Sequence, residues 1–169
     1  VYLDAGCTIN KRGKKRFYEY IDKLESSLNN YGILSFQMTN TNGKGEIQKE
    51  KWWTTNQIFE HFDIKPDSDI GESGQYLGGI LILKKNKHLL EYLDKYEKCI
   101  YNNSSLITDI YNDKNQHEGF KENRHEQSIT SVLRKMHGSE VIEGDESWIV
   151  PFGGQESFKY PFWATRMRD

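Results

Sequence analysis

The stretch YLGGILIL, residues 76–83, decides how this chain is expected to fold. It is the most apolar run in the sequence, and a continuous apolar run of this length is typical of a strand buried on both faces of a sheet. The glycine pair Gly78 and Gly79 interrupts it where bulky side chains would otherwise suit a central strand. A closely packed helix or a substrate lying against the backbone would each explain these glycines, and we give packing the greater weight.

Helical and strand-like patterns alternate on both sides of this run. Apolar residues recur at the spacing of an amphipathic helix over 14–30, 89–100 and 124–137, and a shorter helix is predicted at 55–62. Further strands are predicted at 1–4 (buried), 33–38 and 141–142 (an edge strand), and loops at 39–46 and 102–122. This alternation places the chain in the α/β class, as a single domain over residues 1–169.

The third of the long helices opens with the sequence NRHEQS, residues 123–128. Asn123 is expected to cap it, with Glu126 three residues further on. His125 falls in register with the predicted apolar stripe, so its imidazole should point inward at the positive end of the helix, where an anion is favoured. A well-capped core helix leaves Arg124, His125 and Gln127 unexplained. The stripe itself consists of Ile129, Val132, Leu133 and Met136.

Composition limits the classes of function. The aromatic fraction of 13% argues against disorder. A net charge of −2 leaves no overall field to hold the chain on nucleic acid or on an anionic membrane, so a charged ligand must be met locally. One basic cluster could receive phosphate groups, and we interpret it as the solvated start of a helix. It consists of Lys11, Arg12, Lys14, Lys15 and Arg16.

Cysteine usage and hydropathy bear on location. Cys7 and Cys99 lie far apart and without the spacing of zinc ligands, which favours a reducing compartment. No stretch approaches the roughly 18 apolar residues of a membrane span, and no signal-peptide pattern is present. We therefore expect a cytoplasmic protein without a transmembrane segment.

Two features have the chemistry of a binding site. Asp4 follows the first predicted strand, and in open α/β sheets ligands bind at the carboxyl ends of strands. Its carboxylate would suit a divalent cation on a diphosphate, although an acidic turn residue explains it equally well. Trp52 and Trp53 adjoin the glycine-containing loop at 39–46, where they could stack on a sugar ring or form a hydrophobic cluster.

Three segments in one order carry a family resemblance: YLDAG (2–6), SGQYLGGILILKKNKHLLEYL (73–93) and RHEQSITSVLRK (124–135). Together they resemble the sequence plan of GT-A glycosyltransferases, especially those related to family eight and to capsular and lipopolysaccharide sugar transferases. The resemblance extends to about Gly138 and implies a GT-A-like mixed sheet flanked by helices. The nucleotide-binding strands that precede the acidic motif in such enzymes are expected to lie outside these 169 residues.

The resemblance also implies an activity, which is transfer of a sugar from a nucleotide-sugar donor to a hydroxyl of a glycan or glycoconjugate. Asp4 would match the first aspartate of the metal-binding DxD motif, and Gly6 stands where the second belongs. Gly78 and Gly79 would lie beside the donor. A manganese or magnesium ion is therefore expected to bind only together with a nucleotide diphosphate.

Glu126 and Gln127 would match the pair of residues that faces the transferred sugar, with His125 beside them, and we expect Trp52 and Trp53 to contact the acceptor. We also expect Asp4 and the first turn of the third helix to line one cleft. The final segment GGQESFKYPFW (153–163) resembles the family's closing H-x-x-G-x-x-K-P-W at Lys159 and Pro161, without the histidine.

Two other functions stay open at this point. The first is a noncatalytic carbohydrate-binding or scaffold domain derived from such an enzyme, which the incomplete DxD motif permits. The second is a metal-dependent hydrolase that uses Asp4, His125 and Glu126.

Overall fold

The computed structural model describes residues 1–39 and 46–166. Its centre is a four-stranded mixed sheet made of β1 (Tyr2–Leu3), β3 (Ile33–Phe36), β4 (Ile80–Leu83) and β5 (Glu140–Ile142). The strand order is β1-β4-β3-β5, with β4 antiparallel to β1 and β3, and β3 parallel to β5. The expected mixed α/β architecture and the edge position of β5 are confirmed. The predicted loop at 39–46 falls largely outside the described residues.

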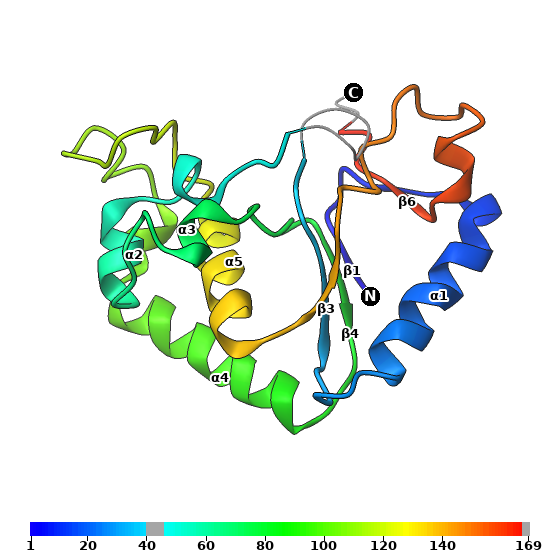
Figure 1. The fold of residues 1–169 in the computed structure, drawn as a ribbon, viewed down its shortest axis with the longest axis horizontal. Coiled ribbons are helices and arrows are strands. Elements are labelled where there is room, and N and C mark those ends of the chain that lie inside the picture. Colours follow the sequence, from blue (N-terminus) through cyan, green and yellow to red (C-terminus); the bar gives the residue numbers. More distant parts are fainter. Residues whose placement is uncertain (40–45, 167–169) are drawn as a thin grey trace.

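Helices cover both faces of this sheet (Figure 1). On one side lie α2 (Asn56–His61), α3 (Asp69–Glu72), α4 (Lys87–Asn102) and α5 (Glu126–His137). On the other lie α1 (Lys14–Glu25) and the two-stranded ribbon of β2 (Thr8–Ile9) and β6 (Phe162–Trp163), which pair antiparallel. Short 3-10 helices join these elements: η1 (Lys11–Gly13), η3 (Glu50–Trp52), η4 (Ser104–Ile107) and η5 (Ser157–Lys159).

The core is divided by the sheet. β3 is buried at every position because both of its faces are covered. Toward α1 the buried cluster includes Tyr20, Leu24, Leu34, Phe36, Ile80, Ile82 and Phe162. Toward α4 and α5 it consists of Ile33, Leu89, Tyr92 and Leu133. A third cluster, held by helical residues alone, contains Ile58, Phe59, Cys99, Leu106, Ile129 and Val132.

A polar face of α5 fixes that helix against the segment 76–78. Arg134, fully buried, donates to the carbonyl oxygens of Tyr76 (3.3 Å) and Leu77 (3.0 Å) and to Ser35 Oγ (3.1 Å). Ser131 Oγ accepts from the amide of Tyr76 at 2.7 Å. Gln127 Oε1 accepts from the amide of Gly78 at 2.9 Å. These side chains are four and three residues apart, so they lie on one side of the helix and satisfy backbone groups that precede β4.

The predicted burial of the first strand and the predicted end of the first helix were wrong. β1 is an edge strand, and Tyr2 is 50% exposed. The first helix ends at Glu25 rather than at 30, because Ser26 Oγ donates to the Asp22 carbonyl and Ser27 Oγ accepts from the Tyr31 amide. Leu28, which the periodicity placed on the buried stripe, is fully exposed.

Two strand and cap predictions near the site were also wrong. The run 76–83 forms a regular strand only over β4, because the amides of Tyr76 and Gly78 bind side chains of α5. Asn123 does not cap α5. The side-chain Nδ2 of Asn123 donates instead to the carbonyl oxygens of Leu106 (3.0 Å) and Thr108 (3.1 Å). His125 occupies the N-cap position of α5, and its side chain makes no capping hydrogen bond. Met136 is exposed because α5 turns Arg134 toward the sheet instead.

A buried ion pair beside this polar face gives the first testable prediction. Glu50 is fully buried, pairs with Lys135 at 2.7 Å and accepts from Thr54 Oγ1 (2.7 Å) and Gln75 Nε2 (3.0 Å). Glu50→Ala would leave the ammonium group buried and unpaired, so the free energy of unfolding in urea should fall by about 3–5 kcal/mol. Glu72→Ala is the matched control, since Glu72 pairs with two lysines at the surface and its loss should change little. Equal losses in the two variants would contradict this account.

A stacked histidine pair between α4 and α5 predicts a pH dependence of stability. The rings of His88 and His137 lie 4.2 Å apart. His88 Nδ1 accepts from the Gly32 amide at 3.1 Å, so its proton resides on Nε2, which faces the His137 carbonyl oxygen at 3.2 Å. Burial lowers the pKa of His88, the hydrogen bond to the His137 carbonyl oxygen opposes this effect, and the charge of the His137 ring adds to it.

The folded state therefore favours neutral His88. This contribution to stability is present above the unfolded-state pKa of about 6.5 and is lost as the pH falls below that value through the lower folded-state pKa. Urea unfolding across this range should show a steeper loss of stability for the natural chain than for His88→Gln. His61→Gln, at an exposed histidine, should keep the natural slope. A His88→Gln curve parallel to that of the natural chain would refute the assignment.

Candidate functional site

Three adjoining hollows form one cleft at the edge of the sheet where β1, β3 and β5 have their carboxyl ends. We call it the arginine cleft because all three hollows are lined by Arg166 and two of them by Arg124. Their volumes are about 340, 410 and 130 Å³. The largest lies outermost at the start of α5, and the smallest lies against β1 and β4. The cleft therefore occupies the position where open α/β sheets bind ligands.

The smallest hollow, here called the inner pocket, contains Asp4 and Gln127 together. The two residues come from the end of β1 and the first turn of α5. The expectation that Asp4 and the start of this helix line one cleft is therefore confirmed. The remaining lining residues are Gly6, Cys7, Leu77, Gly79, Ile80, Ala164 and Arg166.

The glycine pair makes this meeting possible. A Cβ atom on Gly79 would lie 2.7 Å from Asp4 Oδ2, and one on Gly78 would lie 3.0 Å from Gln127 Cβ. The Asp4 amide also donates to the Gly79 carbonyl oxygen at 2.9 Å. Each glycine thus leaves room for one polar side chain of the pocket, so close packing explains both glycines.

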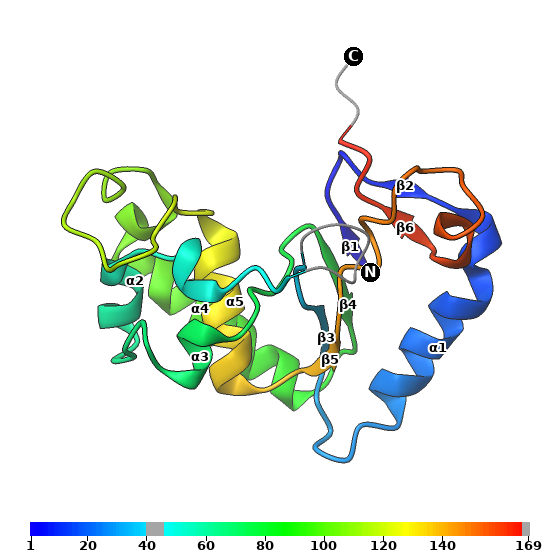
Figure 2. The same ribbon diagram turned by 45° about the horizontal axis from the view of Figure 1, so that its top comes forward.

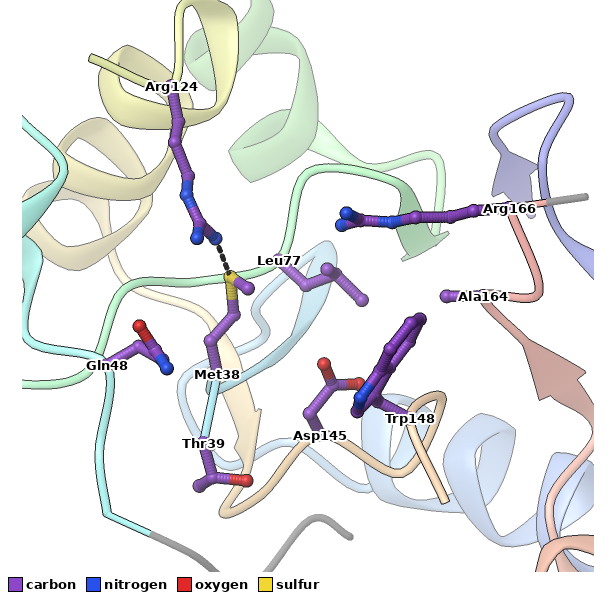
Figure 3. A pocket seen from close by; sticks show the side chains of 9 residues that line it. All are labelled: Met38, Thr39, Gln48, Leu77, Arg124, Asp145, Trp148, Ala164 and Arg166. Carbon is purple, nitrogen blue, oxygen red and sulfur yellow. Dashed lines mark hydrogen bonds between the residues drawn. The ribbon is translucent and has the colours of Figure 1, made fainter. Parts of the chain in front are cut away.

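Two arginines enter the hollow of about 340 Å³, here called the main hollow, from opposite sides (Figure 3). Arg124 lies over the Trp53 ring at 3.7 Å and donates to Met38 Sδ at 3.3 Å. Arg166 is held by its amide on the Gly6 carbonyl oxygen at 2.8 Å, and its guanidinium lies 5.6 Å from the Trp148 ring. Within residues 1–39 and 46–166, no carboxylate forms an ion pair with either guanidinium.

Burial lowers the pKa of Arg124, which nevertheless stays charged at neutral pH because an arginine titrates so far above it. A half-buried guanidinium without a carboxylate partner favours an anion in the hollow in front of it. The cleft is therefore suited to a phosphate or carboxylate group.

Asp145 is a buried carboxyl group on the wall of the same hollow, next to Trp148 (Figure 3). Its Oδ1 accepts from the amide of Ser147 at 3.0 Å. Burial raises the pKa of Asp145, an effect that the Ser147 hydrogen bonds and the charge of Arg166 oppose. A carboxyl group with a raised pKa in a cleft is a candidate for proton transfer.

No sequence motif marks Asp145 or Arg166 as a site residue, and Arg124 stands out in the sequence only because a well-capped core helix does not explain it. Asp145 and Arg166 lie in the irregular segment after β5, where neither helical nor strand periodicity marks an orientation. The available signals were the Asp-x-Ser spacing at 145–147, which favours an Asx turn, and the presence of Arg124 in the motif NRHEQS.

Other predicted site residues lie at the rim. His125 does not point inward as expected: its Nε2 lies 2.9 Å from Asp109 Oδ1, and both side chains are largely exposed. This follows from its positive φ of 52°, which turns it away from the register of α5. Glu126 is exposed and lines none of the three hollows. It nevertheless lies close enough to Tyr2 to help raise the pKa of that phenol, which is raised chiefly by its hydrogen bond to Asp4.

The tryptophan pair stands behind the cleft rather than in it. Lys121 lies over Trp52 at 4.3 Å and Arg124 lies over Trp53 at 3.7 Å, so each indole has a cation on one face. Neither tryptophan lines the three hollows. Lys159 is also outside them, in an exposed ion pair with Glu156 at 2.7 Å.

Among the residues that the structure describes, Asp4 is the one acidic residue on the wall of the inner pocket. Among the described residues, no group of three His, Cys, Asp or Glu side chains is arranged to hold a metal ion. The residues present would therefore fit a divalent cation only as a partial ligand set, completed by oxygens of a bound molecule. The three residues of the hydrolase hypothesis, Asp4, His125 and Glu126, do not line a common hollow.

Comparisons with protein-family models, with curated proteins and with solved structures found no match to this chain. Over the part of the chain that the structure describes, no helix is both long and apolar enough to cross a membrane.

The arginines predict that the cleft binds inorganic pyrophosphate. Arg124→Met keeps the bulk of the side chain and removes its charge, so the dissociation constant measured by calorimetry should rise about tenfold to a hundredfold, the value of one or two charged hydrogen bonds. Lys114→Met removes an exposed charge outside the cleft and should leave binding unchanged. Equal affinity in the natural chain and Arg124→Met would show that the anion binds elsewhere.

Proposed function

We propose that this chain binds a nucleotide-sugar donor in the arginine cleft and transfers the sugar to a hydroxyl group of a glycan or glycoconjugate. The observation that carries the proposal is the inner pocket. Asp4 and Gln127, from two motifs more than a hundred positions apart in the sequence, meet there beside the glycine pair of a third motif. The same motifs, in the same order, support the interpretation of the mixed sheet as GT-A-like.

The arginines would act on the leaving group. Sugar transfer breaks the bond between the anomeric carbon and a diphosphate oxygen, so negative charge grows on the diphosphate as the reaction proceeds. Arg124 and Arg166 can offset that charge without breaking an ion pair first. Asp4 would hold a divalent cation that the diphosphate itself helps to coordinate, and this cation would add to the same stabilisation.

Gln127 would orient the transferred sugar. Its Nε2 donates to Gln75 Oε1 at 2.7 Å and to Met38 Sδ at 3.2 Å, and its Oε1 accepts from the Gly78 amide. These contacts fix the side chain and leave one lone pair of Oε1 able to accept a hydroxyl group. A donor sugar held by this atom would sit in the inner pocket, next to Asp4.

Asp145 would receive the proton that leaves the acceptor hydroxyl when its oxygen bonds to the anomeric carbon. It stands in the hollow that both arginines enter, and its raised pKa favours uptake of a proton. His125 and Glu126, at the outer rim, would contact the acceptor rather than the reacting atoms.

A noncatalytic carbohydrate-binding domain is the second candidate. The observation that favours it is the single carboxylate of the inner pocket, since an incomplete metal site permits binding without turnover. The two functions differ in one measurable respect, which is whether a bound nucleotide sugar is converted.

A screen of nucleotide sugars by thermal shift, with and without manganese, tests binding. One nucleotide class should raise the melting temperature, and the stabilisation should approach about 2.7 kcal/mol at a hundredfold excess over the dissociation constant. Manganese alone should have no effect, and it should strengthen nucleotide binding in the natural chain but not in Asp4→Ala. Stoichiometric manganese binding without nucleotide would show that other ligands exist.

Release of nucleoside diphosphate from the donor so identified tests turnover. Gln127→Ala should retain nucleotide binding and lose about tenfold or more in rate, because it disturbs sugar orientation and not the diphosphate contacts. Gln155→Ala, at an exposed glutamine, is the control and should keep the natural rate. Binding without release across a panel of glycan acceptors would instead support the noncatalytic domain.

A further inference from the structure

The N-terminal end of α1 carries positive charge that the arginine cleft does not use. Lys11 and Arg12 lie in η1, and Lys14 and Lys15 begin α1; all four side chains are exposed. None of them forms an ion pair with a carboxylate of the described residues. The nearest acidic groups are bound by Arg16, which pairs with Glu19 at 2.7 Å and with Glu146 at 2.6 Å.

This arrangement is unfavourable for the helix by itself. Neither η1 nor α1 has an acidic residue in its first turn, and the positive end of the helix dipole adds to the four cations. Lys11 also lies three and four positions before Lys14 and Lys15, a spacing at which like charges repel. An external anionic surface would relieve both effects.

Two of the cations, Lys11 and Lys14, border an apolar hollow of about 580 Å³, whereas Arg12 and Lys15 line a different hollow with Glu19 and Glu146. The apolar hollow is lined by residues of α1 and of the β2–β6 ribbon, which Figure 2 shows on the side of the sheet opposite α4. Its walls include Leu3, Phe17, Pro161 and Phe162, and Lys11 and Lys14 lie at its margin. Ile9, on β2, is 65% exposed beside it, and Tyr18, one turn into α1, is 53% exposed with the Lys14 ammonium 5.8 Å from its ring.

Charge and apolarity together select the kind of partner. An aliphatic side chain, a tyrosine and two lysines on one surface suit the boundary between headgroups and acyl chains, where tyrosine is enriched and lysine meets lipid phosphates. A polyanion such as RNA would use the cations alone and would leave Ile9 and the apolar hollow without a contact. The overall charge of −2 does not oppose this, because membrane attraction falls off within a Debye length and depends on the local cations.

We propose that this basic-apolar surface, made of Ile9, Lys11, Lys14 and Tyr18, binds the surface of an anionic phospholipid bilayer. The cations contact headgroup phosphates, and Ile9 and Tyr18 enter the interfacial layer. The chain is held at the membrane surface in this way and does not span the bilayer. This binding is independent of the activity proposed for the cleft.

Co-sedimentation with phosphatidylcholine vesicles, with and without phosphatidylserine, tests the proposal. The natural chain should bind only the vesicles that contain phosphatidylserine. Lys11→Gln/Lys14→Gln should weaken binding about 25-fold, since each cation at an anionic surface contributes about fivefold. The control Lys85→Gln/Lys114→Gln changes the net charge equally at exposed lysines on other elements and should keep the natural affinity. Equal losses in the two double variants, or no preference for phosphatidylserine, would overturn the proposal.

Ile9→Ser separates a membrane surface from a general polyanion site. It keeps every charge and should weaken vesicle binding severalfold, because the apolar contact with the interface is lost. An unchanged vesicle affinity in Ile9→Ser, combined with tight binding of an RNA oligonucleotide by the natural chain, would overturn the membrane proposal in favour of a polyanion site. Circular dichroism of each variant identifies any loss that comes from misfolding.

Discussion

The structure depends on the polar face that α5 presents to the segment before β4. Gln127, Ser131 and Arg134 each bind backbone groups of residues 76–78, and Arg134 also reaches Ser35 on β3. Helices usually meet a sheet through apolar side chains that tolerate small shifts, whereas hydrogen bonds to a backbone specify one register. The position of α5 along the sheet is therefore determined closely, and with it the position of everything in its first turn.

This register has a consequence for the cleft. Because Gln127 is itself one of the three anchors, it cannot move independently of the sheet. Arg124, three residues earlier, is fixed in turn by its amide on Ser128 Oγ (3.0 Å) and by its contacts with Trp53 and Met38. The glycine pair then admits Asp4 and Gln127 to the same space from opposite sides of one backbone segment. Packing and site geometry are here two results of one arrangement.

Periodicity predicted those parts of the fold that are held by apolar burial. The class, the helices α4 and α5 and the strand β4 all follow from recurring apolar residues, because such residues must face a core. Periodicity failed where polar contacts determine which side chain caps a helix or is buried. Asn123 has the spacing of a cap and instead anchors the η4 segment, and Arg134 takes the buried side of α5 while Met136 is exposed. Neither choice leaves a mark in a hydrophobic pattern, since the partners are carbonyl oxygens distant in sequence.

The residues of the site likewise divide into those that the sequence predicts and those that it does not. Asp4 and Gln127 could be placed together in advance because the carboxyl end of a strand and the amino end of a helix are both known to attract polar ligands. Asp145 and Arg166 could not, because they reach the cleft through an irregular segment whose path depends on the β2–β6 pairing. Yet these two residues, with Arg124, determine its electrostatics. Two guanidinium groups, neither in an ion pair with a carboxylate of the described residues, face a buried carboxyl group whose pKa is raised, so the charge in the main hollow is positive on balance. A molecule that enters it must bring negative charge at one end, and uncharged hydroxyl groups would suffice at the other, beside Asp4 and Gln127.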